Sequence, residues 1–387
     1  MKKIVILGST GSIGTSLINI VKKNQKEFKI LLLTANKNYK KLIKQANFFQ
    51  VKNIIIIDKK SFLISKKILK NKNINVYNDF NSLKKILKNK KIDYAMSSIS
   101  GFEGLMPTLD IIKFTKVVAI ANKESIICGW HLIKKNLNKY KTKFIPVDSE
   151  HFSIWSLIKN IDYKSLEKVY ITASGGPFRK YPLKLFKNIT PAQALDHPNW
   201  SMGKKISIDS ATMMNKVFEV IEAKKIFNLS YRQLKIIIHP QSYLHAIVKF
   251  NNGLTKLLVH DTNMTIPIFN SLYPDYDKKI NSNSLNISVL NNLNLEIIDR
   301  NRFPVIKLLK SLVERDSLFE TIIVSANDRL VNRFLKGEIN FIDISTLLLK
   351  TVNLSEFKKF KNIKPQNAEQ ISKLANYVSL KINNMSV

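Results

Sequence analysis

Three glycines near the start of the chain constrain its fold more than any other feature. Gly8, Gly11 and Gly14 follow an apolar run at residues 4–7 and open an amphipathic stretch, so they occupy a turn between a strand and a helix. Glycines there let the backbone approach a pyrophosphate, and the free N–H groups of the helix attract its charge. The spacing is GxxGxxG and not the commoner GxGxxG. Its place in a strand, turn and helix unit nevertheless predicts a dinucleotide-binding loop.

The first 150 residues alternate short β-branched runs with longer amphipathic stretches, which is typical of βαβ units. Nearly continuous apolar character at residues 54–57 fits a strand covered on both faces. We therefore expect an α/β protein with an N-terminal Rossmann-like parallel sheet. Its predicted strands span residues 4–7, 30–33, 54–57, 94–97, 117–120 and 144–147.

The pattern changes after residue 150, where a polar, proline-containing segment precedes a helical stretch at 210–227. Strands are expected at 236–238, 246–250 and 255–259, which predicts a central α+β catalytic domain. Helix-period spacing near the end predicts a small C-terminal helical domain. The expected boundaries are 1–148 for the dinucleotide-binding domain, 149–273 for the central domain with a lid at 174–203, 274–300 for a linker, and 301–387 for the helical domain.

The segment after the second predicted strand lacks the acidic residue that binds the ribose 2′-hydroxyl of NAD. It offers Asn36, Lys37 and Asn38 instead. A lysine flanked by amides suits the 2′-phosphate of NADP, so NADPH is the expected cofactor. The alternative is that Lys37 is an ordinary surface lysine.

Two carboxylates, Asp148 and Glu150, follow the last predicted strand of the sheet. In an extended backbone they point to the same side, at the strand end where ligands bind in open α/β sheets. Oxygen ligands suit a hard cation such as Mg²⁺ or Mn²⁺. The alternative is a helix N-cap at Asp148, with Glu150 in the first turn. A third ligand could come from the 210–227 helix, where the sequence alone does not choose between Glu219 and Glu222.

Polar side chains in and near that helix could hold a phosphate, because Ser210, Asn215 and Lys216 supply hydroxyl, amide and ammonium donors. Upstream, glycines 175–176 and a bulky Trp200 and Met202 pair bracket the polar segment. This pattern predicts a lid that closes over a substrate and excludes water. The alternative is that the aromatic residues belong to an ordinary core.

Lysine and arginine outnumber the acidic residues by 63 to 28, which gives a net charge of +35. A strongly basic chain often binds nucleic acid. Here, however, the lysines are spread through almost every segment together with asparagine and isoleucine, and no basic stripe with interleaved aromatic residues stands out. We attribute the charge to an AT-rich genome and expect no nucleic acid partner.

No apolar run approaches the roughly 20 residues that a membrane span needs, and the first apolar run is too short for a signal peptide. The single cysteine, Cys128, excludes an internal disulfide. We therefore expect a soluble, cytoplasmic protein that has no membrane partner.

Five segments follow one another along the chain in an order that matters for its identification. They are the glycine loop 8–14, Ala121-Asn122-Lys123-Glu124-Ser125, Val147-Asp148-Ser149-Glu150-His151, Ser174-Gly175-Gly176-Pro177-Phe178, and residues 197–219. Together they resemble the 1-deoxy-D-xylulose 5-phosphate reductoisomerase family. The stretch 197–216 is long and unusual in composition, so the resemblance is more specific than any single glycine loop.

The resemblance implies that 1-deoxy-D-xylulose 5-phosphate is rearranged and reduced with NADPH to 2-C-methyl-D-erythritol 4-phosphate, on the non-mevalonate route to isoprenoid precursors. It also implies a divalent metal, Mg²⁺ or Mn²⁺ with Co²⁺ as an alternative. A homodimer is implied too, with the strands of the central domain as its interface.

The resemblance also implies a role for each matching residue. Metal binding falls to Asp148, Glu150 and Glu219, which favours Glu219 over Glu222. Substrate contacts near the metal fall to Lys123 and Ser149, phosphate binding to Ser174, Ser210, Asn215 and Lys216, lid closure to His197, and shielding of the substrate to Trp200 and Met202. The implied cofactor positions are Thr10, Gly11, Ser12, Ile13, Asn36, Lys37, Asn38, Asn122, Glu124 and Gly203.

Two departures from the family pattern lie close to these positions. Asn36 stands where the family usually has glycine, and Val217 replaces a common glycine after Lys216. The departure at Asn36 bears on the detail of adenosine-phosphate binding, although Asn, like glycine, tolerates positive φ. Two rival hypotheses are an NADP-dependent dehydrogenase of another carbonyl compound, which needs no three-carboxylate site, and a nucleic-acid-binding protein whose affinity falls steeply with salt.

Overall fold

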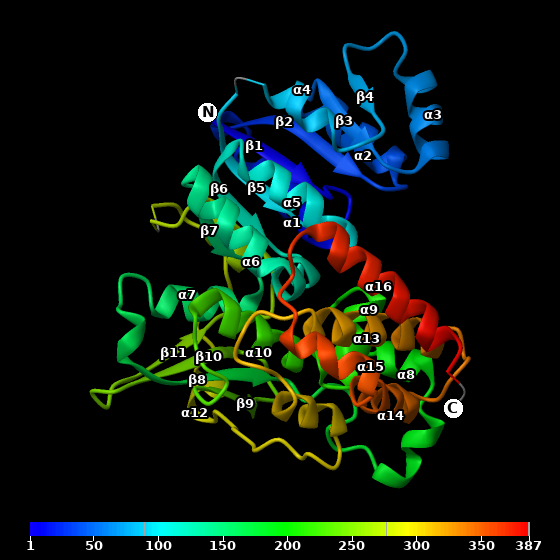
Figure 1. Ribbon diagram of the computed structural model, residues 1–387. Helices are drawn as coiled ribbons and strands as arrows, with labels where there is room; N and C mark the ends of the chain where they lie inside the picture. Colours follow the sequence, from blue (N-terminus) through cyan, green and yellow to red (C-terminus); the bar gives the residue numbers. More distant parts are fainter. Residues whose placement is uncertain (89, 276, 386–387) are drawn as a thin grey trace. The chain divides into compact units, whose positions relative to one another are not determined.

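The computed structural model describes residues 1–88, 90–275 and 277–385 (Figure 1). The chain divides into two compact units. The first comprises Met1–Ser125, Leu132–Asp148 and Met264–Ile280, and the second comprises Ile126–His131, Ser149–Asn263 and Asn281–Val387. The three-part division expected from the sequence stays a prediction. Segment 264–280 belongs to the first unit, whereas the sequence placed it in the central domain and the linker.

A seven-stranded sheet forms the centre of the first unit, and every neighbouring pair of its strands is parallel. The strand order is β4-β3-β2-β1-β5-β6-β7, so the chain runs outward from β1 in one direction and then in the other. This confirms the predicted doubly wound sheet. The strands are β1 (Lys2–Leu7), β2 (Phe28–Ala35), β3 (Asn53–Ile56), β4 (Asn75–Tyr77), β5 (Ile92–Ser97), β6 (Thr115–Ile120) and β7 (Lys143–Pro146).

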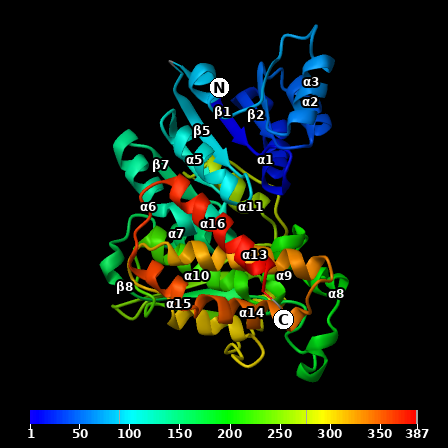
Figure 2. The same ribbon diagram turned by 45° about the vertical axis from the view of Figure 1, so that its right-hand side comes forward.

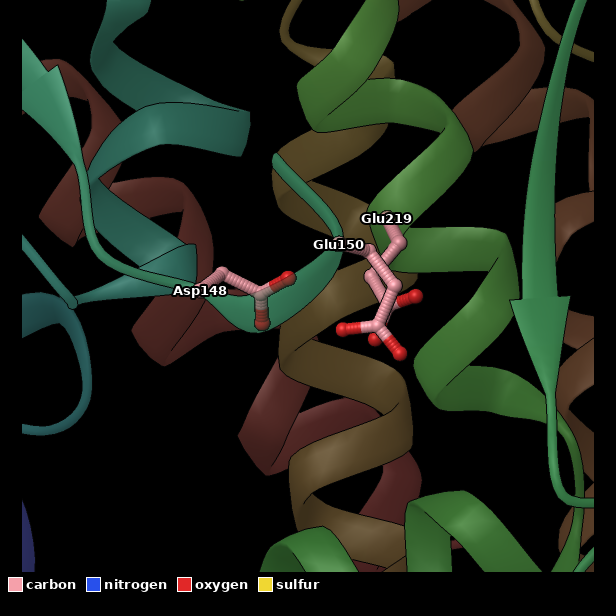
Figure 3. A group of neighbouring side chains, drawn as sticks. All are labelled: Asp148, Glu150 and Glu219. Atoms are coloured by element: carbon pink, nitrogen blue, oxygen red, sulfur yellow. The ribbon is translucent and has the colours of Figure 1, made fainter. Parts of the chain in front are cut away.

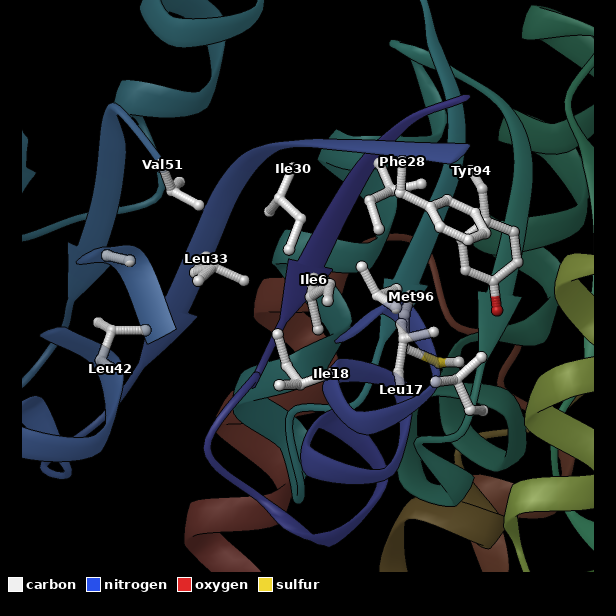
Figure 4. Packing of buried hydrophobic residues seen from close by; sticks show 14 of the residues in the cluster. Ile6, Leu17, Ile18, Phe28, Ile30, Leu33, Leu42, Val51, Tyr94 and Met96 are labelled. Carbon is white, nitrogen blue, oxygen red and sulfur yellow. The ribbon is translucent and has the colours of Figure 1, made fainter. Parts of the chain in front are cut away.

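Helices cover this sheet and bury a core of β-branched and leucine side chains (Figure 4). Ile6 and Leu33 of the strands meet Leu17 and Ile18 of α1 in that core. The segment 264–280 joins the unit through α11, which packs against α1. The helices are α1 (Ser12–Lys23), α2 (Tyr39–Phe48), α3 (Lys59–Ile68), α4 (Ser82–Leu87), α5 (Leu105–Ile112), α6 (Lys123–Tyr140) and α11 (Thr265–Leu272), with short 3-10 helices η1 (Gln25–Glu27) and η2 (Phe102–Gly104).

The glycine loop lies between β1 and α1, as predicted. Gly8 has φ 83°, a left-handed conformation that favours glycine, and Gly11 is the N-cap residue of α1. Gly14 is needed for a different reason, since a Cβ there would lie 2.3 Å from the carbonyl oxygen of Gly8. The loop therefore folds tightly against the first turn of its helix.

The second unit contains a four-stranded mixed sheet in the order β11-β10-β8-β9. The inner strands β10 and β8 are antiparallel, whereas β8 and β9 are parallel. Predicted strands at 236–238, 246–250 and 255–259 are confirmed. The strands are β8 (Leu166–Ala173), β9 (Leu234–Ile238), β10 (Leu244–Phe250) and β11 (Thr255–Val259).

Helices make up the rest of the second unit. The C-terminal part is helical, as predicted, and α13 packs against both α14 and α16 (Figure 2). Among the residues that the structure describes, no helix is both long and apolar enough to cross a membrane. The helices are α7 (Ser149–Leu157), α8 (Pro191–Leu195), α9 (Lys204–Ala211), α10 (Met214–Phe227), α12 (Ile287–Asn291), α13 (Phe319–Leu335), α14 (Phe341–Val352), α15 (Ser355–Lys358) and α16 (Ala368–Asn383), with 3-10 helices η3 (Tyr163–Ser165), η4 (Leu183–Asn188), η5 (Pro304–Lys310) and η6 (Lys359–Asn362).

The prediction of one continuous helix over residues 210–227 is wrong at the start of that range. The helix is interrupted between α9 and α10, where Met213 adopts a left-handed φ of 66°. The hydroxyl of Thr212 donates to the carbonyl of Ile208 and accepts from the backbone N–H of Met214. Threonine side chains compete in this way for backbone groups that would continue a helix.

We predict that Gly14→Ala lowers the free energy of unfolding by ~1–3 kcal/mol, because the new methyl group meets backbone atoms that cannot move aside. Gly11→Ala is the matched control, since its Cβ would make only an ordinary 3.5 Å contact. It should change that free energy by at most about 1 kcal/mol. Urea unfolding of the two variants measures the difference, and equal midpoints would contradict the steric explanation.

Candidate functional site

Three acidic side chains converge at the predicted metal site. One carboxylate oxygen from each of Asp148, Glu150 and Glu219 lies within 4.8 Å of the other two (Figure 3). Glu150 and Glu219 are buried, and Asp148 is partly exposed. A set of oxygen donors without cysteine or histidine fits a hard divalent cation.

The local backbone differs from the extended one assumed for Asp148 and Glu150. Strand β7 ends at Pro146 and α7 begins at Ser149, so Glu150 occupies the first turn of a helix, as the alternative interpretation required. An acid favours that position because the helix N-terminus is positive. Glu219 lies on α10, and its side chain reaches the same point (Figure 3). The structure brings the three acids together, but not through the extended backbone that was expected between Asp148 and Glu150.

A buried lysine compensates the two buried acids. Lys216 Nζ lies 2.6 Å from Glu150 Oε1 and 2.6 Å from Glu219 Oε2. Burial alone would lower the pKa of Lys216, but the two neighbouring carboxylates outweigh it, so the pKa lies above its usual value and the side chain stays charged. Lys123 makes a close ion pair with Asp148. A positive charge thus compensates each of the three acids.

Glu222 lies one turn beyond Glu219 on α10 and is equally buried. Its carboxylate lies 4.0 Å from Nδ1 of His151 and does not join the acidic group. The Nε2 atom of His151 lies 2.9 Å from the backbone carbonyl of Glu219, to which a protonated Nε2 donates. The structure therefore favours Glu219 as the third acid, and it gives Glu222 a partner elsewhere.

The predicted phosphate-binding residues lie around the break between α9 and α10. Ser210 lies in the last turn of α9, and Asn215 and Lys216 lie in the first turn of α10. The loop carrying Ser174 approaches the same place, because a Cβ on Gly176 would lie 2.9 Å from the carbonyl oxygen of Ser210. Asn215 also donates to Glu219, so phosphate donors and acids share one hydrogen-bonded group.

His197 joins this group through Ser174. Its Nδ1 atom accepts from the backbone N–H groups of Asn199 and Trp200, at 3.2 and 3.1 Å. The neutral ring therefore carries its proton on Nε2, which lies 3.1 Å from Ser174 Oγ and donates to it. Burial, assisted by the positive charge of Lys216, lowers the pKa of His197 to about 4.

The segment predicted as a lid is fixed at both ends. Phe178 and Phe186 pack against Phe341 of α14. At the other end the side chain of Asn199 donates to the carbonyl of Pro240 at 2.6 Å and to Ser242 Oγ at 2.9 Å. Beyond that anchor Met202 is half-buried and Gly203 is exposed. Closure of the segment stays a prediction.

The glycine loop carries four of the predicted cofactor positions: Thr10, Gly11, Ser12 and Ile13. Sequence reasoning missed Lys41, whose Nζ donates to the carbonyl of Thr10 at 3.2 Å and to Thr15 Oγ1 at 2.7 Å. This ammonium group fastens α2 to the loop. Its position on the exposed half of an amphipathic helix full of lysines gave no signal that would have separated it from its neighbours.

Five of the other predicted cofactor positions follow strands of the same sheet, whereas Gly203 caps α9 in the second unit. Asn38 caps α2 by accepting from Lys41 N, and Asn36 and Lys37 are exposed beside it. Asn122 caps α6 and donates to the carbonyl of Gly101 at 2.9 Å, so its side chain organises the backbone. Glu124 lies in the first turn of α6. Loops that follow parallel strands meet at the carboxyl edge of a sheet, where dinucleotides bind.

Comparison with known proteins covers nearly all of the chain. Three family models match it: "1-deoxy-D-xylulose 5-phosphate reductoisomerase" over residues 4–129, its C-terminal domain over 144–227, and "DXP reductoisomerase C-terminal domain" over 260–379. The 1-deoxy-D-xylulose 5-phosphate reductoisomerase of Pelagibacter ubique is 68% identical over the full length of both chains. The chain belongs to this reductoisomerase family.

Solved structures of the reductoisomerase family share the whole fold. The enzyme from Zymomonas mobilis, in complex with NADPH, is 31% identical and covers 98% of each chain with a TM-score of 0.87. A structure of DOX-P reductoisomerase in complex with NADPH, fosmidomycin and magnesium is 27% identical over 100% of each chain, with a TM-score of 0.89. The predicted fold class is thereby confirmed.

We predict that His197 titrates at about pH 4, against an ordinary value of 6.5, because burial and Lys216 disfavour its charged form. Its folded-state pKa lies below the unfolded one, so the contribution to stability is complete above the unfolded pKa and is lost as pH falls through the folded pKa. NMR titration of the imidazole signals, assigned with His197→Gln, measures this pKa. A midpoint near the ordinary value would contradict the proposed environment.

Proposed function

We propose that this protein rearranges 1-deoxy-D-xylulose 5-phosphate and reduces the product with NADPH to 2-C-methyl-D-erythritol 4-phosphate, using a divalent metal. The convergence of Asp148, Glu150 and Glu219 beside a cluster of phosphate donors is the observation that carries the proposal. Membership of the reductoisomerase family agrees with it. A plain dehydrogenase of the kind considered as a rival needs no such group of acids.

The three acids would hold the metal, and a bound cation supplies Lewis acidity to the substrate's oxygens. Lys123, paired with Asp148, stands where it could donate to an oxygen near the metal. Ser149 lies between two of the acids in sequence, and its hydroxyl donates to Glu150 at 2.6 Å. These residues would orient the hydroxyl and carbonyl groups while the carbon skeleton rearranges.

The phosphate of the substrate would be held by Ser174, Ser210, Asn215 and Lys216. Once a cation neutralises Glu150 and Glu219, the ammonium of Lys216 no longer has to do so and can face the phosphate. His197, neutral at physiological pH, would donate through Nε2, and Trp200 and Met202 would keep water from the substrate. The long alkyl chain of Lys216 makes this change of partner a small movement.

The reductant would lie along the glycine loop, where NADPH supplies the hydride. Free N–H groups at the start of α1 would face its pyrophosphate. Asn36, Lys37 and Asn38 would face the 2′-phosphate, while Asn122, Glu124 and Gly203 would complete the cofactor contacts. The absence of an acid at residues 36–38 favours NADPH over NADH.

The enzyme is proposed to be a cytoplasmic homodimer. Strand β11 is the edge of its sheet; Leu257 on it is 46% exposed, and Leu254 directly before it is 60% exposed. An exposed apolar edge is commonly covered by pairing. The cytoplasmic location rests on the water-soluble character of both ligands, and recovery of the activity in a membrane fraction would contradict it.

The experiment that tests the function follows the absorbance of NADPH with the pure substrate, with and without Mg²⁺ or Mn²⁺. Turnover should require both substrate and metal, and NADH should be the weaker reductant. Metal-independent turnover would favour the dehydrogenase alternative. Tight binding of random duplex DNA at physiological salt would instead favour the nucleic-acid hypothesis.

We predict that Glu219→Gln lowers kcat at least about 100-fold, because a metal oxygen is lost where charge develops. NADPH binding, measured by fluorescence, should stay nearly intact. Glu222→Gln is the matched control, since it removes an equally buried acid one turn away on the same helix. Undiminished turnover in Glu219→Gln, or an equal loss in both variants, would contradict the assignment.

We also predict that Leu257→Lys shifts the protein from dimer to monomer, because a charge on the β11 edge opposes pairing. Sedimentation velocity measures the change. Leu63→Lys replaces a leucine that is 50% exposed on α3 and should leave the mass unchanged. A monomeric wild-type protein would refute the proposed dimer outright.

A further inference from the structure

A pair of stacked histidine rings lies against Trp200. His245 belongs to β10, and His260 directly follows β11. Their ring centroids lie 3.7 Å apart with an interplanar angle of 16°. Trp200 meets His245 edge to face, with centroids 6.2 Å apart and planes at 72°. Three rings from separate segments thus form one stack, which we call the Trp200 stack.

The backbone fixes both histidines. The backbone N–H of His260 donates to the carbonyl of Tyr243, and Nε2 of His245 lies 3.1 Å from the carbonyl of His260. Nδ1 of His260 lies 2.7 Å from the carbonyl of Asp261. Since a carbonyl oxygen only accepts, each ring donates through the nitrogen nearest to it. Neither histidine can turn without losing a hydrogen bond.

The environment of His260 suits a stacking role. His245 is 1% exposed and His260 is 9% exposed, so both imidazole rings are largely removed from water. Burial lowers the pKa of His260, which keeps its ring neutral. Its Nε2 atom is buried and has no hydrogen-bond partner among the described residues. The ring therefore makes one polar contact and presents its face to His245.

We propose that His260 is a positioning residue for the reaction: by stacking on His245 it fixes the orientation of Trp200. The inference rests on the proposed function, in which Trp200 covers the substrate. Without the ring of His260, one face of the His245 ring would have no packing partner. The His245 ring could then move, and Trp200, which packs against it, would no longer be held in one orientation. Protein interiors transmit such a change because close-packed side chains leave no spare volume.

The test compares His260→Ala, which removes the ring, with His260→Phe, which keeps a flat ring but no nitrogen. His260→Ala should raise the KM for 1-deoxy-D-xylulose 5-phosphate about tenfold, as expected for loss of a ring pair, with a smaller change in kcat. The KM for NADPH should stay constant. His260→Phe should restore the substrate KM to within about twofold of wild type, because the ring face is what matters.

A control variant separates this role from general destabilisation. His239 is also buried, donates to a single backbone carbonyl, and has an Nε2 atom without a described partner, but no ring contact with Trp200 is present among the described residues. His239→Ala should leave the substrate KM within about twofold of wild type. Equal effects of His239→Ala and His260→Ala would overturn the proposal.

Fluorescence of Trp200 provides a readout that does not depend on turnover. In a background with Trp130→Phe and Trp155→Phe, only Trp200 emits. His260→Ala should shift its emission to the red and make it more accessible to acrylamide, whereas His260→Phe should not. If His260→Ala does not fold by circular dichroism, His260→Leu takes its place, since leucine fills the volume without a ring.

The outcomes are distinct. Unchanged KM and emission in His260→Ala would overturn the proposal. So would a His260→Phe variant as impaired as His260→Ala, because Nε2 would then be the active part. A wild-type protein without activity on 1-deoxy-D-xylulose 5-phosphate would refute the proposed function, while the emission measurements would still decide whether His260 holds Trp200.

Discussion

Repulsion among three neighbouring carboxylates is the constraint on which this site depends. Two of the acids are buried, and bringing like charges together away from water is costly unless positive charge accompanies them. Lys216 supplies that charge from the same helix as Glu219, and Lys123 supplies it beside Asp148. The free protein can therefore keep the three acids assembled. Removing either lysine would leave an uncompensated acid, which makes the lysines part of the fold as well as of the chemistry.

Two different features of the fold position the polar groups predicted to bind the cofactor and the phosphate. Parallel strands deliver their following loops to one edge of a sheet, so the glycine loop, Asn38 and Asn122 come from three different strands of one unit. The phosphate donors arise differently, from a break between two helices. That break places Ser210 at the end of one helix and Lys216 at the start of the next, and the loop at Gly176 packs against Ser210.

Much of the fold followed from local patterns. β-Branched runs located six of the seven strands in the parallel sheet, because buried strands must be apolar on both faces. Strand β4 was missed because its three residues are too few to show an alternating pattern of apolar side chains. Strand β8 was missed because Glu167 and Lys168 interrupt its apolar pattern. The helix over 210–227 was continued through Thr212 because periodicity does not reveal a side chain that bonds its own backbone.

The site was predictable to the extent that its residues carry charge in unusual places. Acids at a strand end and within an apolar helix indicated a metal, but the residues alone did not choose between Glu219 and Glu222. The fold places Glu219 with the other two acids. Lys41 and His260 gave no such signal. Their roles depend on which segments lie beside them in the fold. The sequence does not indicate those neighbours, because Lys41 is one of several lysines in its helix and His260 simply follows an edge strand.

The left-handed Met213 has a consequence for how motion could spread through the second unit. A continuous helix behaves as a stiff rod, so a shift at one end would be carried to the other. Here the residue between α9 and α10 has φ 66°, which costs ~1–3 kcal/mol and is offset by the ~1.5–3 kcal/mol that burying a methionine side chain contributes. The joint interrupts the rod. In the proposed closure of the lid segment, a shift at Gly203, which caps α9, would therefore not have to be carried along one rigid helix to Lys216 and Glu219 on α10.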